Sequence, residues 1–337
     1  MLVLLQTPES IISDSLIYGY IIFGGLAANI AYNLCASILR ALGDSKTPFY
    51  AIIVSTIINI IFDFVFVFGL KTGVEGPAAV TVMSQLVSAV ICFARIRKIE
   101  ILQLSKDDFR NTLSMAGNLL KNGIPMAAMN SITAVGCMTV QYFVNGMGVV
   151  YTSAYSACSK YINLFMQPAC TAGYTMSSFT SQNCGAEKYD RIVSGLKVCL
   201  SVAAVSYIIL GSVMVFFSGE LASFMLNGPE QIGLASIYLV RCGIMIFAVD
   251  FLFVFRSGCQ GMGKPFLPMI SGVLEMIMRV LVIALFIGKI GFAAAAYAEI
   301  AAWCAALAIN VYAFVYFIRK KTKHDKKEFH HFALRKC

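Results

Sequence analysis

The sequence predicts an all-α integral membrane protein with about nine transmembrane helices. Of its 337 residues, 59 % are hydrophobic and 13 % are charged, and the mean hydropathy is +0.78. An average soluble domain has roughly 25 % charged residues, so a soluble fold could not bury this much apolar surface. Two further observations support the prediction, namely the length of the apolar runs and the distribution of basic residues.

The apolar runs are each long enough to cross a bilayer, which takes about 20 residues of helix. They cover residues 15–39, 48–70, 74–95, 123–147, 151–177, 192–217, 231–257, 265–288 and 291–318. The polar stretch 96–122 reads as a cytoplasmic linker between two membrane units. The predicted organisation is a partial N-terminal unit of three helices (1–95), this linker (96–122), a six-helix C-terminal unit (123–318) and a basic cytoplasmic tail (319–337).

Lys and Arg are distributed unevenly between alternate loops. They gather in every second loop, including the one that we expect to hold Arg256 and Lys264, and in the tail, whereas the opposite loops carry only Lys71 and Lys289. Cytoplasmic loops retain positive charge, so this pattern predicts a cytoplasmic C-terminus. The net charge of +9 then reflects topology and contact with anionic lipid, and we expect no nucleic-acid partner.

An internal repeat relates the two units with an offset of about 220 residues. Gly43 and Pro48 match Gly263 and Pro268, and Gly73 matches Gly291. Three further helices precede the second copy, whereas the first copy begins almost at Met1. We therefore expect a truncated product, fragment or split gene that lacks three helices, about 100 to 120 residues, of its first unit. The alternative is a true nine-helix protein.

Polar residues inside the apolar runs are candidates for function, because ionisable groups are costly in a bilayer. Asn59 and Asp63 stand four residues apart and share one helix face, and Thr81 on the next helix can add a hydroxyl. Oxygen ligands suit sodium, and a partly desolvated carboxylate can instead take a proton. We predict a cation-coupling site at these residues. A helix–helix hydrogen bond without an ion is the alternative.

The repeat places other residues at the equivalent positions of the second unit. Asn59 matches Arg279, Asp63 matches Ile283 and Thr81 matches Glu299, so the cation-binding groups are absent there. For Arg279 we predict a structural ion pair, with Glu275 four residues earlier or with Glu299.

Asp250 is central in its apolar run and could bind a cationic substrate or a proton, or pair with Arg241 or Lys160. We expect no metal site, since the cysteines are scattered and the tail histidines lack ligand spacing. No nucleophile with a neighbouring base is present in the runs, so an integral membrane enzyme is not favoured.

Several motifs together resemble the multidrug and toxic compound extrusion (MATE) family, in particular its DinF-like branch. They are Arg40–Pro48 (RALGDSKTP), Asn59–Asp63 (NIIFD), Gly73–Ala79 (GVEGPAA), Gly123–Pro125 (GIP) and Gln182–Ala186 (QNCGA). The resemblance implies a two-lobed fold, here with an incomplete N-terminal lobe, in a bacterial plasma membrane. It also implies that Asn59, Asp63 and Thr81 act with an aspartate on the family's first helix, which this sequence lacks.

The implied function is export of cationic or amphipathic drugs and toxic compounds in exchange for sodium ions or protons, with no cofactor. We expect a monomer, unless another polypeptide supplies the missing helices. A lipid-linked oligosaccharide flippase of the same superfamily is the first alternative, and an inactive truncated fragment is the second.

Overall fold

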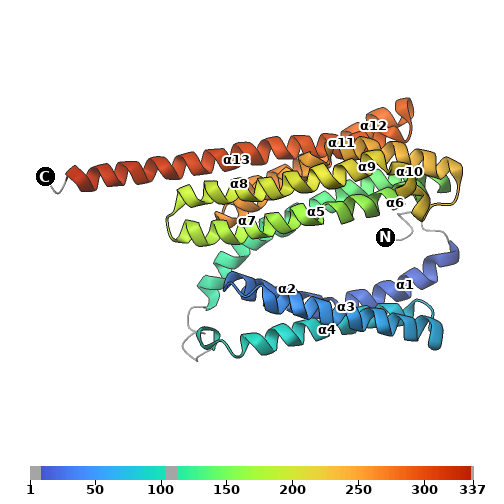
Figure 1. Ribbon diagram of the computed structural model, residues 1–337, viewed down its shortest axis with the longest axis horizontal. Helices are drawn as coiled ribbons and strands as arrows, with labels where there is room; N and C mark the ends of the chain where they lie inside the picture. Colours follow the sequence, from blue (N-terminus) through green and yellow to red (C-terminus); the bar gives the residue numbers. More distant parts are fainter. Residues whose placement is uncertain (1–8, 104–111, 335–337) are drawn as a thin grey trace. The chain divides into compact units, whose positions relative to one another are not determined.

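The protein divides into two helical units, residues 1–112 (unit 1) and 113–337 (unit 2) (Figure 1). The computed structural model describes residues 9–103 and 112–334, and these contain helices and short turns without a strand. The boundary between the units falls within the stretch 96–122 that we expected to be a linker. Residues 112–122 of that stretch are helical.

Unit 1 is built around one central helix. Its helices are α1 (Glu9–Gly24), α2 (Leu26–Ala41), α3 (Lys46–Phe64, continued by a wider turn at Val65–Gly69) and α4 (Glu75–Ile96). α4 packs against α1, α2 and α3. α1 and α2 form one apolar pair bent by 43°. The bend lies at Gly25, where a side chain would collide with Val82 of α4.

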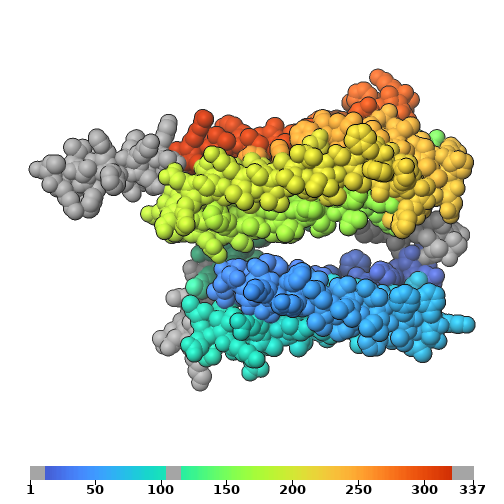
Figure 2. All heavy atoms as spheres, in the orientation of Figure 1, coloured from blue at the N-terminus to red at the C-terminus, as the bar shows by residue number. Residues whose placement is uncertain are grey.

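Unit 2 is organised around α11, which packs against α6, α7, α8, α10 and α13. α7 and α8 lie side by side on the face that Figure 2 shows in yellow-green and yellow. The helices are α5 (Thr112–Asn145), α6 (Val149–Phe165), α7 (Gln167–Gly185), α8 (Tyr189–Ser206), α9 (Ser212–Phe216), α10 (Ser218–Met225), α11 (Pro229–Gly261), α12 (Phe266–Ile290) and α13 (Ala293–Leu334).

The fold class is as predicted, but the count of nine spans is not confirmed. Seven helices of the described residues are long and apolar enough to cross a membrane, and the bent pair α1–α2 makes eight. The remaining expected span, 151–177, is divided at Met166 between α6 and α7. Pro168 lies in the first turn of α7, where its missing N–H and its ring prevent continuation of α6. The second half is also rich in Ser and Thr, which lowers its hydropathy.

The internal repeat appears in the backbone of both units. α2 and α11 end in the same turn, in which Gly43 and Gly263 have φ of +87° and +68°. In each turn the following residue donates its N–H to a carbonyl five residues back, Asp44 to Leu39 and Lys264 to Cys259. This closes the helix in a Schellman motif. Gly73 and Gly291, which precede α4 and α13, also match, with φ of +61° and +59°.

The two turns differ in one side chain. The Asp44 carboxylate accepts hydrogen bonds from the Thr47 N–H (3.0 Å) and the Thr47 hydroxyl (2.8 Å), and it pairs with Arg95 of α4 (3.1 Å). These contacts, the Thr47 N–H foremost, hold the pKa of Asp44 below its ordinary value. Lys264 occupies the equivalent place, and its side chain has no acceptor with which to cap the start of α12.

Removing the carboxylate should loosen the start of α3. We expect Asp44→Ala to lower the free energy of unfolding by about 1 kcal/mol at neutral pH, the typical effect of losing a helix cap. The measurement is the melting temperature of the purified protein in detergent. Lys264→Ala is the matched control and should change it little. Equal losses in both variants would contradict the capping role.

The contribution of Asp44 should also depend on pH with a definite sign. Because its pKa is lower in the folded protein than in the unfolded chain, its stabilisation is complete above the ordinary carboxyl pKa of about 4 and disappears as the pH falls through the lowered value. The difference in melting temperature between wild type and Asp44→Asn should therefore narrow on acidification below about pH 4. A difference that widens there would count against this assignment.

Candidate functional sites in the two units

Unit 1 places the predicted coupling residues on neighbouring helices. Asn59 and Asp63 lie one turn apart on α3, and Thr81 lies on α4, which packs against α3; all three are partly buried. The Asp63 Oδ1 atom is shielded from solvent and has no hydrogen-bond partner among the described residues. The Thr81 hydroxyl donates to the Pro77 carbonyl within α4 (2.8 Å), which leaves its oxygen available as an acceptor.

Two of the three equivalent residues in unit 2 contact each other. Arg279 on α12, the counterpart of Asn59, contacts Glu299 on α13, the counterpart of Thr81, at 3.0 Å. By the repeat, Asn59 and Thr81 occupy the positions of Arg279 and Glu299 on the corresponding helices of unit 1. Ile283, the counterpart of Asp63, is fully buried.

Unit 2 contains a buried row of alternating charges, Arg256, Glu275, Arg279 and Glu299, which we call the charge row. Arg256 pairs with Glu275, and Arg279 contacts Glu275 at 3.4 Å. Each side chain is at most 10 % exposed. The sequence predicts Arg279 beside Glu275 or Glu299, and in the structure Arg279 contacts both.

Arg256 is where the sequence interpretation was wrong. It was assigned to a basic loop with Lys264, whereas it lies inside α11 and is only 7 % exposed. A signal was present in the sequence. The apolar runs of the second unit contain two glutamates, Glu275 and Glu299, and Arg279 alone cannot neutralise both, which favours a second cation nearby.

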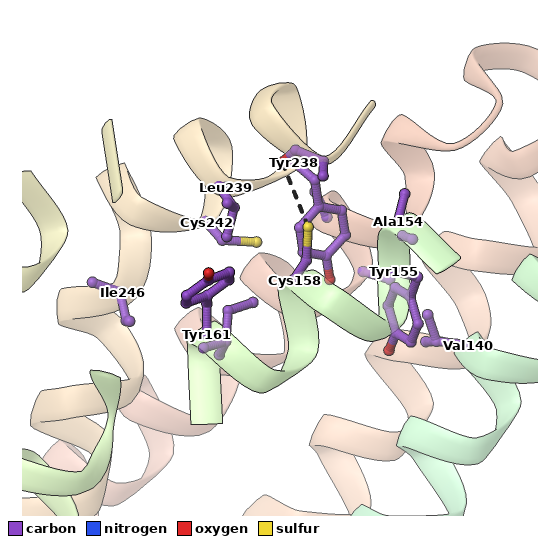
Figure 3. Packing of buried hydrophobic residues seen from close by; sticks show 14 of the residues in the cluster. Val140, Ala154, Tyr155, Cys158, Tyr161, Tyr238, Leu239, Cys242 and Ile246 are labelled. Atoms are coloured by element: carbon purple, nitrogen blue, oxygen red, sulfur yellow. Dashed lines mark hydrogen bonds between the residues drawn. The ribbon is translucent and has the colours of Figure 1, made fainter. Parts of the chain in front are cut away.

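A cavity of about 450 Å³ opens beside the charge row. Five helices supply its walls, and the lining includes all four members of the charge row. Aromatic walls come from Tyr155 of α6, Tyr238 of α11 and Trp303 of α13. The two tyrosine rings meet edge to face, with centroids 5.8 Å apart, in the packed region that Figure 3 shows.

Two residues that line the cavity each have a polar atom that is shielded from solvent and lacks a partner among the described residues, Arg256 Nε and Thr133 Oγ1. Buried polar groups are nearly always hydrogen-bonded, so such atoms indicate a place where a ligand or water binds. The volume lies within the usual range of small-molecule sites, roughly 300 to 1,000 Å³.

Asp250 lies apart from the lining of this cavity. It is 1 % exposed on α11, and its Oδ1 atom has no hydrogen bond within the described part of the chain. Neither expected partner pairs with it. Arg241 lies over the ring of Tyr297 at 5.3 Å, and Lys160 is exposed.

Comparison with known proteins agrees with this architecture. The MatE family model matches residues 1–65 and 125–285. The probable multidrug resistance proteins YoeA and YpnP of Bacillus subtilis are 32 % and 30 % identical over 69 % and 57 % of this chain. The crystal structure of the Vibrio cholerae MATE transporter VcmN in the bent form superposes with a TM-score of 0.82, at 16 % identity, over 95 % of this chain and 73 % of that one.

The chain spans about half the length of the curated relatives it matches, 52 % of YoeA and 43 % of YpnP. The family match nevertheless covers most of the chain and both units. We conclude that this multi-pass membrane protein belongs to the MatE family, the multidrug and toxic compound extrusion (MATE) transporters.

Proposed function

We propose that the protein is a secondary active antiporter that exports cationic or amphipathic small molecules in exchange for sodium ions or protons. Family membership and the multidrug resistance proteins among its relatives support export. The observation that carries the coupling proposal is the shielded Oδ1 atom of Asp63, which has no partner in the described residues. A carboxylate oxygen withdrawn from water without a donor is ready to accept a cation.

The proposed coupling site combines Asp63 with its two neighbours. Asn59 supplies an amide carbonyl from one turn earlier on α3, and Thr81 supplies a hydroxyl oxygen from α4. A sodium ion would be held by these oxygens, or a proton by the carboxylate alone. Binding of the cation favours one arrangement of the transporter over another only by its differential affinity for the two, which is how its gradient drives export.

The residues of unit 2 do not reproduce this site at the equivalent positions. Ile283 replaces the carboxylate and Arg279 brings a positive charge. Asp250 is the remaining buried carboxylate without an ion pair in the described part of unit 2, and we propose it as a lower-ranked site for substrate or proton. We further propose that the protein is a monomer in a bacterial plasma membrane, with its C-terminus in the cytoplasm, as the excess of basic residues in alternate loops supports.

Replacing Asp63 should weaken both cation binding and export. We expect Asp63→Asn to reduce the binding of radioactive sodium by the purified protein, or its proton uptake, at least about tenfold, which corresponds to about 1.4 kcal/mol. Efflux of a fluorescent lipophilic cation from an efflux-deficient bacterial host should fall in parallel.

Asp14→Asn is the matched control, because it makes the same change at an exposed carboxylate on α1. Efflux should stop when the driving gradient is removed, by replacing sodium with potassium or by adding a protonophore. Asp63→Asn with unchanged cation binding would refute the coupling site, and Asp250→Asn would then be the next variant.

For Arg279 with Glu275 and Glu299 we propose a structural role, joining α12 to α13. Breaking a buried ion pair leaves an uncompensated charge, so Glu299→Leu should destabilise the protein by about 3 to 5 kcal/mol. The double variant Arg279→Met with Glu299→Leu should recover part of that loss. Melting temperatures of the three proteins measure the effect. A double variant less stable than Glu299→Leu alone would rule out a simple pair.

A further inference from the structure

We propose that the unit 2 cavity binds a zwitterionic small molecule, one with a carboxylate and an ammonium group on an apolar or aromatic body. This goes beyond the export function proposed above, because binding here requires neither unit 1 nor a coupling cation. The charge row supplies the polar groups for such a ligand, and the aromatic walls of the cavity supply a surface for its body.

One end of the charge row has an unused donor. Arg256 engages Glu275 and Ser271 through Nη2, whereas its Nε–H is buried and has no partner among the described residues. Arg279, by contrast, uses Nε, Nη1 and Nη2 in contacts with its two glutamates. An unpaired guanidinium N–H in the interior is costly, and a ligand carboxylate would remove that cost with a charge-assisted hydrogen bond.

The other end of the charge row has an unused acceptor. Glu299 receives both of its contacts from Arg279 on Oε2, and its Oε1 forms no hydrogen bond with the described residues. A carboxylate can accept on both oxygens, so Oε1 is available to an ammonium group. Arg256 and Glu299 both line the cavity, which thus presents a donor and an acceptor to one occupant.

The charge balance of the row selects the ligand class. Two guanidinium groups and two carboxylates cancel, so a purely cationic or purely anionic ligand would bring a net charge into the membrane interior. A zwitterion brings none. The rings of Tyr155, Tyr238 and Trp303 supply an apolar wall for its body and aromatic faces that attract an ammonium group.

Trp303 makes this proposal directly measurable, because it is the single tryptophan of the chain and lines the cavity. The probe is p-bromophenylalanine, whose bromine quenches tryptophan fluorescence on contact. Its N-acetyl derivative retains only the negative charge, and its amide retains only the positive charge. With the purified full chain in detergent, we expect saturable quenching by the zwitterion at concentrations at least about tenfold lower than by either derivative.

Arg256→Gln should remove most of the preference for the zwitterion over the amide, because the amide does not present a carboxylate. Arg241→Gln makes the same substitution on the same helix outside the cavity, where Arg241 lies over Tyr297, and should leave the preference intact. Helical circular dichroism and gel filtration establish that each variant is folded.

The ranking of the three probes on the wild-type protein tests the proposal even if Arg256→Gln does not fold. Equal or tighter quenching by the amide or by the N-acetyl derivative would overturn it, as would quenching that never saturates. Because this is an equilibrium measurement on unit 2, its result is independent of whether Asp63 couples transport.

Discussion

The buried charge row is the constraint on which the architecture of unit 2 depends. Four charged side chains lie in helices that are otherwise apolar, and their cost in a membrane is tolerable only because each contacts an opposite charge. Those contacts join α11, α12 and α13, so the registry of the three helices is set by ionic geometry as well as by packing. The cavity lies along this charge row, and Arg256 Nε is the donor that the row leaves without a partner among the described residues.

The two units show how one backbone plan carries different chemistry. The turns at Gly43 and Gly263 agree in φ and in hydrogen bonding, as do the glycines that precede α4 and α13. Between these fixed points the side chains diverge, with amide and hydroxyl groups in unit 1 and an ion pair in unit 2. The two units share the residues that the backbone requires and differ at the compared positions of the helix interface.

Much of the fold could be predicted because its signals are local. Apolar runs and loop charges depend only on the sequence within one helix, and the glycine turns follow from backbone conformations that favour glycine. The division of the span 151–177 was missed because the run was assessed as a whole, although Pro168 marked the break. Arg256 was misplaced because its partner Glu275 lies on another helix, so the excess of glutamates becomes visible only when the charges of several helices are compared. The cavity is lined by residues of five helices, so no motif within a single helix could predict it. The role of Asp63 stays a prediction, since it concerns an ion and not the fold.

The break between α6 and α7 separates two structural roles within one apolar run. α7 is held close to α11 at Gly173, where a Cβ atom would lie 3.0 Å from the Phe253 carbonyl oxygen. α6, on the other side of the break, supplies Tyr155 and Ile162 to the cavity wall. A continuous helix would carry both halves along one line, whereas the break at Met166 separates them. One apolar run therefore serves two purposes, because its first half lines the cavity while its second half packs closely on α11.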